Sequence, residues 1–173
     1  MKPPFSDEEL WSKCHDGPYW NVDPAWAPYL KTLRGPRGET LLHRARRAGP
    51  IVSLLGCGLD PNARDEMGRT PLMWVRDSEA NRVLIAGGGD VHALDPDGNG
   101  VLAHQSGGLE HSIGYSRPDY DALEGLIAAG AKLPTPAQAE AWIACAHGCV
   151  SHHVEDGEAR RFEAWVRELL TRC

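Results

Sequence analysis

The sequence predicts an all-α protein built from stacked repeats, and two observations lead to this fold class. A six-residue motif occurs three times, and its third position falls at residues 40, 70 and 100, so the period is thirty residues. A fixed period within about 20–50 residues is typical of solenoids, whose units bury a continuous core between them. At both ends of the chain, helix-start signals precede apolar residues at helical spacing.

The clearest copy of the motif is Gly68-Arg69-Thr70-Pro71-Leu72-Met73. Thr70 fits an N-cap and Pro71 the first helical position, so a helix should start there. A leucine recurs at positions 42, 72 and 102, and we expect these leucines at equivalent buried sites. Each unit then closes with Gly-x-Asp-x-x-Ala, at 58–63 and 88–93, with a looser echo at 130–133.

These motifs resemble the ankyrin repeat, in which a β-turn finger is followed by two helices over about 33 residues. The resemblance implies an all-α ankyrin-repeat solenoid of stacked helix pairs with β-turn fingers. Because the period here is three residues shorter, we expect the second helix of each unit to be trimmed. The resemblance implies that His43 is structural and bonds to the turn, and its replacement by Met73 and Ala103 in the other units argues against a shared chemical role.

The chain divides into a helical N-terminal cap at 1–34, three repeats at 35–133 and a helical C-terminal cap at 134–173, all in one domain. Ser6-Asp7-Glu8-Glu9 is a capping box, and Asp23-Pro24 starts a second helix that carries Trp26, Tyr29, Leu30 and Leu33. The first two repeats should place inner helices near 40–48 and 70–76, and outer helices near 50–56 and 78–86.

The third repeat starts at Gly98 but is interrupted by an insertion over 106–118, and its outer helix resumes at 120–127. Insertions in such arrays fall on one face and often serve binding. Thr135-Pro136 opens a further helix, and apolar residues at 162, 165, 166, 169 and 170 define a strongly amphipathic one. The last two helices should cap the stack.

Composition favours a cytoplasmic protein that binds another protein. The first twenty residues lack the pattern of a secretory signal, and no apolar run reaches bilayer length. Five cysteines at irregular spacing indicate reduced thiols. The net charge of −6 combines +5 over 31–64 with −4 over 65–100. A nucleic-acid face would be basic along its length, so we do not expect a nucleic-acid partner. We also expect no membrane partner, and we expect the free protein to be a monomer.

No catalytic constellation is present, and we expect no enzyme activity and no cofactor. The glycines at 87–89 lack the Lys-Ser/Thr that follows a phosphate loop, and Ser53 and Ser106 lack nucleophile-elbow surroundings. The Cys/His cluster at 145–153 holds zinc-type donors, but its spacing matches no standard site, so we expect no bound metal. Metal binding or catalysis by this cluster is the third functional alternative.

If the resemblance holds, fingers and inner helices form the partner-binding face. Trp74 is the best anchor candidate, although it could equally be a core residue. We expect the acidic turn residues of this face to tolerate charge reversal without loss of the fold. The residues assigned to the face are Arg64, Asp65, Glu66, Met67, Arg69, Met73, Trp74, Arg76, Asp77, Asp95, Asp97, Asn99 and His104.

The chain also resembles small, acidic, Arg-rich stand-alone ankyrin-like proteins of bacteria, some of which are immunity proteins of secreted toxins. This resemblance implies a non-catalytic protein that binds and inhibits a cognate toxin, and acidic fingers would suit a basic toxin domain. The alternative is an adaptor or host-directed effector that tethers a protein partner without inhibiting it.

Overall fold

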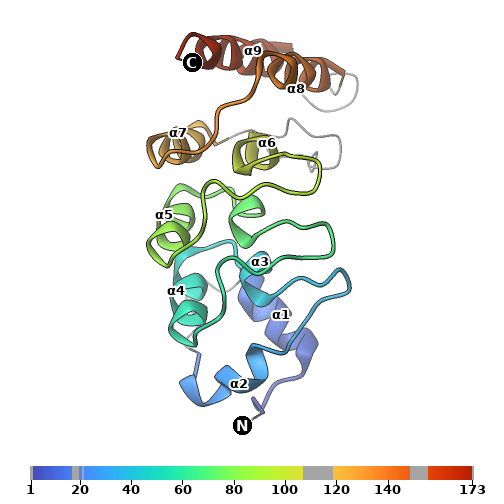
Figure 1. The fold of residues 1–173 in the computed structure, drawn as a ribbon. Coiled ribbons are helices and arrows are strands. Elements are labelled where there is room, and N and C mark those ends of the chain that lie inside the picture. Colours follow the sequence, from blue (N-terminus) through green and yellow to red (C-terminus); the bar gives the residue numbers. More distant parts are fainter. Residues whose placement is uncertain (1, 17–19, 21, 107–118, 149–155, 173) are drawn as a thin grey trace.

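The structure is a computed structural model of the 173-residue chain and describes residues 2–16, 20, 22–106, 119–148 and 156–172. Within these ranges all regular secondary structure is helical, and no strand is present. The helices stack in successive tiers, with the N-terminal and C-terminal helices at opposite ends (Figure 1). Over the same ranges, no helix has the length and apolar character needed to cross a bilayer.

The first helix, α1 (Asp7–Asp16), begins at the capping box that the sequence predicts. The Glu9 backbone N–H donates to Ser6 Oγ at 3.2 Å, and the Ser6 N–H donates to Glu9 Oε2 at 2.7 Å. On its inner side the Cys14 thiol donates to the Leu41 carbonyl at 3.0 Å, and burial raises the pKa of this thiol to about 12. Cys14 is therefore a protonated packing residue that fixes α1 against the first repeat.

The second predicted helix is divided into two short pieces. Asp23 accepts a hydrogen bond from the Ala25 N–H at 2.8 Å and starts the 3₁₀ turn η1 (Pro24–Trp26), which is followed by α2 (Ala27–Leu30). Pro28 has no N–H to donate to the carbonyl four residues earlier, so a continuous α-helix would lack a bond at this point. The start signal is thus confirmed, but the helix is shorter than its apolar pattern indicates.

Each repeat contributes a short inner helix and a nine-residue outer helix, and these pairs form the middle tiers (Figure 1). The inner elements lie between the outer helices and a column of turns that projects on the opposite side (Figure 1). The inner elements are α3 (Leu41–Arg44), the 3₁₀ turn η2 (Pro71–Met73) and α6 (Val101–Ser106); the outer helices are α4 (Ala48–Gly56), α5 (Ser78–Ala86) and α7 (Tyr120–Ala128).

The expectation that the outer helix is the trimmed element is wrong, because the inner helices are the short ones. After α3 the chain turns extended at Ala45, with φ −70° and ψ 118°. Ala45 and the equivalent Val75 are buried, so the first two inner elements end just before a side chain that enters the core. Asp77 follows and accepts the Ala80 N–H at 2.8 Å, which starts the next outer helix at once.

A glycine with a left-handed backbone follows each outer helix, at Gly58, Gly88 and Gly130, with φ between 73° and 94°. The N–H of the residue after each glycine reaches back to a carbonyl five residues earlier, as in Leu59 N–H to Leu54 O at 3.2 Å. The glycine at 130 shows that the third unit resumes the pattern of the first two after its insertion. Of that insertion, residues 107–118 lie outside the described residues.

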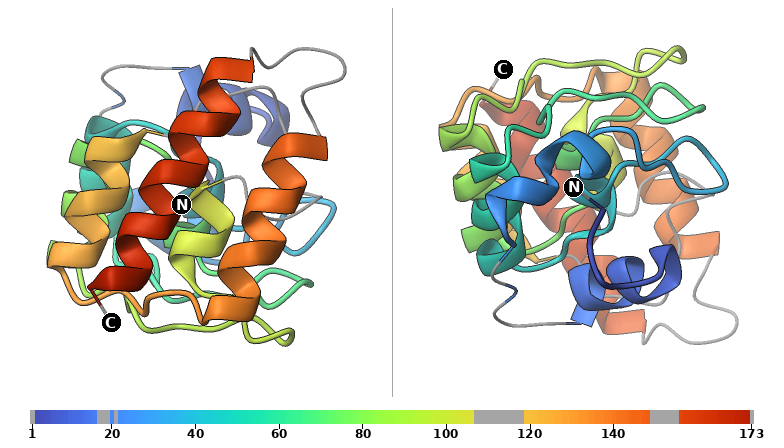
Figure 2. Two further views of the ribbon diagram at one scale, coloured as in Figure 1. Left: turned by 90° about the horizontal axis from the view of Figure 1, so that it is seen from above. Right: turned by 90° about the horizontal axis from the view of Figure 1, so that it is seen from below.

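The C-terminal helices α8 (Pro136–Gly148) and α9 (Asp156–Thr171) pack against each other across the end of the stack (Figure 2). The helix start predicted at Thr135-Pro136 is confirmed, and the Gln138 N–H donates to Thr135 Oγ1 at 3.3 Å. Trp165 joins α9 to the third repeat, because its indole N–H donates to Glu124 Oε1 at 2.8 Å.

The three repeat leucines occupy equivalent core sites, as the period predicts: Leu42, Leu72 and Leu102 are at most 1% exposed. Leu72→Ala should lower the free energy of unfolding by about 2–5 kcal/mol, because the truncation removes buried methyl groups and leaves a cavity. Urea unfolding measures the change. Val52→Ala is the control, since Val52 is 56% exposed and should matter little. A loss below about half a kcal/mol at Leu72 would refute the shared core.

Candidate functional site

Three turns, at 35–39, 65–69 and 95–99, share one backbone geometry, and we call them the first, second and third finger. In each finger the first N–H donates to the fifth carbonyl at 2.8–3.0 Å, and the fourth N–H donates to the first carbonyl at 2.9–3.0 Å. The fourth residue is always a glycine with positive φ, between 72° and 81°. This position requires glycine because the left-handed backbone disfavours a side chain.

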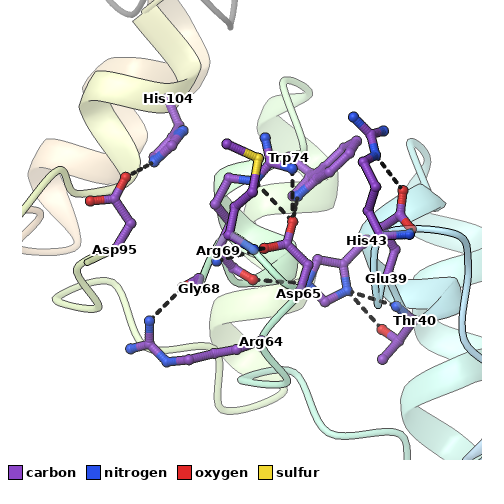
Figure 3. A network of polar contacts seen from close by, with 12 residues as sticks. Glu39, Thr40, His43, Arg64, Asp65, Gly68, Arg69, Trp74, Asp95 and His104 are labelled. Atoms are coloured by element: carbon purple, nitrogen blue, oxygen red, sulfur yellow. Dashed lines mark hydrogen bonds and ion pairs between the residues drawn. The ribbon is translucent and has the colours of Figure 1, made fainter. Parts of the chain in front are cut away.

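The second finger closes around the buried carboxylate of Asp65 (Figure 3). Its Oδ1 accepts the backbone N–H groups of Met67 and Arg69, both at 2.9 Å. Its Oδ2 accepts Arg69 Nε at 2.9 Å and the indole N–H of Trp74 at 3.1 Å. Four donors from the turn and the adjacent inner element therefore converge on one anion.

The third finger repeats this arrangement with a histidine in place of the tryptophan. Asp95 Oδ1 accepts the N–H groups of Asp97 and Asn99 at 3.0 and 2.8 Å. His104, thirty residues after Trp74, places Nε2 at 2.9 Å from Asp95 Oδ2 (Figure 3). Burial lowers the pKa of His104, and the bond to Asp95 only partly offsets this, so the ring is neutral at pH 7 and donates through Nε2–H as the indole does.

In the first finger, a residue at a different position supplies the carboxylate that lies inside the turn. Gly35 stands where the other fingers carry aspartate, and Glu39, at the fifth position, turns its carboxylate back into the finger. Glu39 Oε2 accepts the Arg37 N–H at 2.8 Å. A Cβ on Gly35 would lie only 2.6 Å from Glu39 Oε2, so the glycine leaves the space that this carboxylate fills.

The buried finger carboxylates at Glu39 and Asp95 are ionised at pH 7. Burial raises the pKa of Glu39, but hydrogen bonds from backbone N–H groups, first that of Arg37, outweigh burial and bring the pKa below its usual value. For Asp95, burial again acts upward, and hydrogen bonds from Asn99 and His104 lower the pKa overall. The first and third fingers are therefore each held by an ionised carboxylate with several donors.

His43 links the first repeat to the second finger, which agrees with its expected structural role. Its Nδ1 lies 3.1 Å from the Thr40 N–H, which it accepts, and Nε2 lies 3.0 Å from the Arg69 carbonyl, to which it donates (Figure 3). Burial lowers the pKa of His43, so the neutral ring with the proton on Nε2 satisfies both partners.

Adjacent fingers are joined in two different ways. The Glu66 N–H donates to the Arg37 carbonyl at 2.9 Å and ties the second finger to the first. At the equivalent place in the third finger, Pro96 has no N–H, and its ring instead packs against Gly68. Arg64 replaces the missing bond, because its guanidinium donates to the carbonyls of Gly68 and, at 2.8 Å, Leu94.

Trp74 lies half-buried at the centre of this network (Figure 3). The guanidinium of Arg69 lies 4.4 Å from its ring centroid, and that of Arg37 lies 5.2 Å from it. The imidazole of His43 meets the ring edge to face at 6.3 Å. The indole N–H also donates to Asp65, so Trp74 contacts neighbouring side chains through both its ring and its N–H group.

The structure sorts the predicted face into exposed and buried residues. Asp65, Met73 and His104 are buried, so they support the face from beneath and cannot touch a partner. Asp77 is half-buried as the N-cap of α5. The exposed members are Arg64, Glu66, Met67 and Asp97, and the other half-buried members are Arg69, Trp74, Arg76, Asp95 and Asn99. Of these, Asp95 is half-buried as a whole residue, but its side chain is only 7% exposed.

Sequence reasoning assigned no residue of the first finger to the face and so missed Arg37. Arg37 projects from the first finger with its side chain 53% exposed, in the position that Met67 and Asp97 hold in the other two. The thirty-residue period carried this signal, since counting back from 67 and 97 leads to 37. Arg37 therefore belongs to the exposed face.

The expectation that all the acidic turn residues tolerate charge reversal is corrected for Asp65 and Asp95. These carboxylates accept backbone and side-chain N–H groups inside the turns, so a basic residue there would remove the acceptor and place an unpaired cation in the turn. Glu66 and Asp97 are exposed and remain suitable for substitution.

The Cys/His cluster at 145–153 lies largely outside the described residues. Of its donors the structure describes only the side chain of Cys145, which is half-buried on α8. Across the part of the chain that is described, no group of three or more metal-binding side chains comes together.

No family model matches the chain, and no curated protein matches it.

Asp65→Ala should lower the free energy of unfolding by about 3 kcal/mol or more, because it leaves two backbone N–H groups and the Trp74 indole N–H without their acceptor. Asp97→Ala is the matched control and should stay within about half a kcal/mol, because its carboxylate is exposed. Urea unfolding at pH 7 compares the two variants. Equal losses would show that the buried carboxylate does not hold the finger.

Met73→His should raise the free energy of unfolding by about 0.5–2 kcal/mol. Thr70 Oγ1 is buried without a hydrogen-bond partner, whereas the equivalent Thr40 hydroxyl lies 2.9 Å from His43 Nδ1. An imidazole at 73 would supply the missing partner. It could also donate to the Asn99 carbonyl, which is equivalent to the Arg69 carbonyl that His43 contacts. Thermal unfolding measures the gain, which should shrink in a Thr70→Val background; an unchanged or lower stability contradicts the prediction.

Proposed function

We propose that this chain is a non-catalytic protein-binding module whose partner contacts the exposed side chains of the three fingers. The observation that carries the proposal is the shared construction of the fingers. Each holds a buried carboxylate that fixes the turn, and each directs its third side chain to solvent. A surface fixed before binding loses little conformational entropy when a partner docks, so more of the contact energy appears as affinity.

Within this proposal the chain is an ankyrin-type solenoid, although its inner helices are unusually short. Three features support the assignment: the thirty-residue period, the His43 hydrogen bonds to Thr40 and to the next finger, and the stacked helix pairs with projecting turns. A solenoid of this type presents binding residues on its turns and carries no chemistry of its own.

We also propose that a monomer of this chain binds a bacterial toxin domain in the cytoplasm and inhibits it. Support comes from the resemblance to small stand-alone immunity proteins and from the charge pattern, since exposed Glu66 and Asp97 would pair with basic side chains of the toxin. Tethering without inhibition is the competing outcome of the test.

The test searches the neighbouring genes for a toxin-like reading frame, co-expresses its product with the chain, and measures cell survival and binding by the purified proteins. The wild-type chain should restore survival, and the double variant Met67→Glu, Asp97→Lys should bind at least about tenfold more weakly, since both changes lie on exposed finger positions. The matched control is Val52→Glu, Glu79→Lys, which makes similar changes on the outer helices α4 and α5.

Three results are decisive. Survival that depends on the fingers and not on the outer helices supports inhibition through the proposed face. A saturated complex in which the partner keeps full activity contradicts inhibition and favours an adaptor. Equal binding by wild type and the finger variant contradicts the proposed face.

A further inference from the structure

The third residues of the three fingers form a row of different chemistry. Arg37 is a cation, Met67 is apolar and Asp97 is an anion, and they lie at equivalent positions thirty residues apart. All three side chains reach solvent: that of Arg37 is 53% exposed, Met67 is 47% exposed, and Asp97 is exposed as well. Direct contacts between neighbouring fingers hold the row in order, from Glu66 N–H to Arg37 O and from Pro96 to Gly68.

We propose that this row recognises a segment of a partner protein that presents a carboxylate, an apolar side chain and a cation, in that order from the first finger to the third. The inference rests on the proposed protein-binding function and gives the chemistry of the partner at that same face. Charge complementarity selects this occupant, because a uniformly basic or acidic partner would meet a like charge at one end of the row.

Arg37 is the residue best prepared to bind the carboxylate. Its Nε donates to Glu39 Oε1 at 3.2 Å, and its guanidinium lies over the Trp74 ring, so the orientation of the side chain is largely fixed before binding. Half of the side chain remains exposed, and a guanidinium can bind a carboxylate through two parallel N–H groups.

The other two members suit their assigned contacts. Met67 and Val52 are the large hydrophobic residues that stand exposed among the described residues, and Met67 alone of these lies on a finger. Its flexible thioether can adapt to an apolar side chain of varied shape. The Asp97 backbone N–H is held by Asp95 at 3.0 Å, which fixes the turn from which its exposed carboxylate projects.

The experiment selects a library of random 12-residue peptides, displayed on phage, against the immobilised full-length chain. An extended 12-residue peptide reaches at most about 40 Å, which lets one peptide contact neighbouring fingers. The same library is selected against Arg37→Gln, against Asp97→Lys and against the outer-helix control Val52→Glu. Thermal unfolding of each variant confirms that it is folded.

Selection on the wild type should enrich peptides with an acidic, an apolar and a basic residue in one consistent order along the chain. Arg37→Gln should reduce the acidic enrichment at least tenfold, and Asp97→Lys should replace the basic preference with an acidic one. Val52→Glu should leave the pattern unchanged.

Different outcomes would contradict the two proposals. Peptides that require the fingers but show no consistent order of charges would contradict recognition by the row, while they would still support the protein-binding face. Peptides that bind every finger variant as they bind the wild type, or a selection that yields no binder, contradict both the row and the face.

Discussion

A buried carboxylate inside each finger is the interaction on which the rest of the structure depends. Backbone N–H groups in a tight turn need acceptors, and Glu39, Asp65 and Asp95 supply them from within the turn. In the second and third fingers the same anion also accepts a side chain of the adjacent inner element, Trp74 or His104. The turns are therefore joined to the core, and their exposed side chains leave from fixed positions.

Contacts between repeats differ from one junction to the next, and this gives each unit a defined neighbour. Asn81 Nδ2 donates to Gln105 Oε1 and Gln105 Nε2 donates to Asn81 Oδ1, both at 3.0 Å, in a buried amide pair between the second and third units. The equivalent positions one unit earlier are Ile51 and Val75, which are buried and apolar. A shifted stack would leave the amides facing hydrocarbon without partners, which is costly.

Much of the fold could be predicted from the sequence, because its signals are local. The period located the leucines, the caps located α1 and α8, and Gly58 and Gly88 located the outer helix ends. The short inner helices could not be predicted, since they depend on where Ala45 and Val75 enter the core. At the site, Met67 and Asp97 were identified as members of the exposed face. The sequence could not distinguish an aspartate that accepts hydrogen bonds inside a turn from an aspartate that is solvated on the turn surface.

The most direct test of this account is amide hydrogen exchange at residues 37, 67 and 97, whose N–H groups each donate to a finger carboxylate. If the carboxylates hold the fingers, all three amides should exchange at least about a hundredfold more slowly than an unstructured reference, which corresponds to an opening cost of about 3 kcal/mol. Exchange of any one of them at the rate of an open turn would contradict the claim that the fingers are fixed before a partner binds.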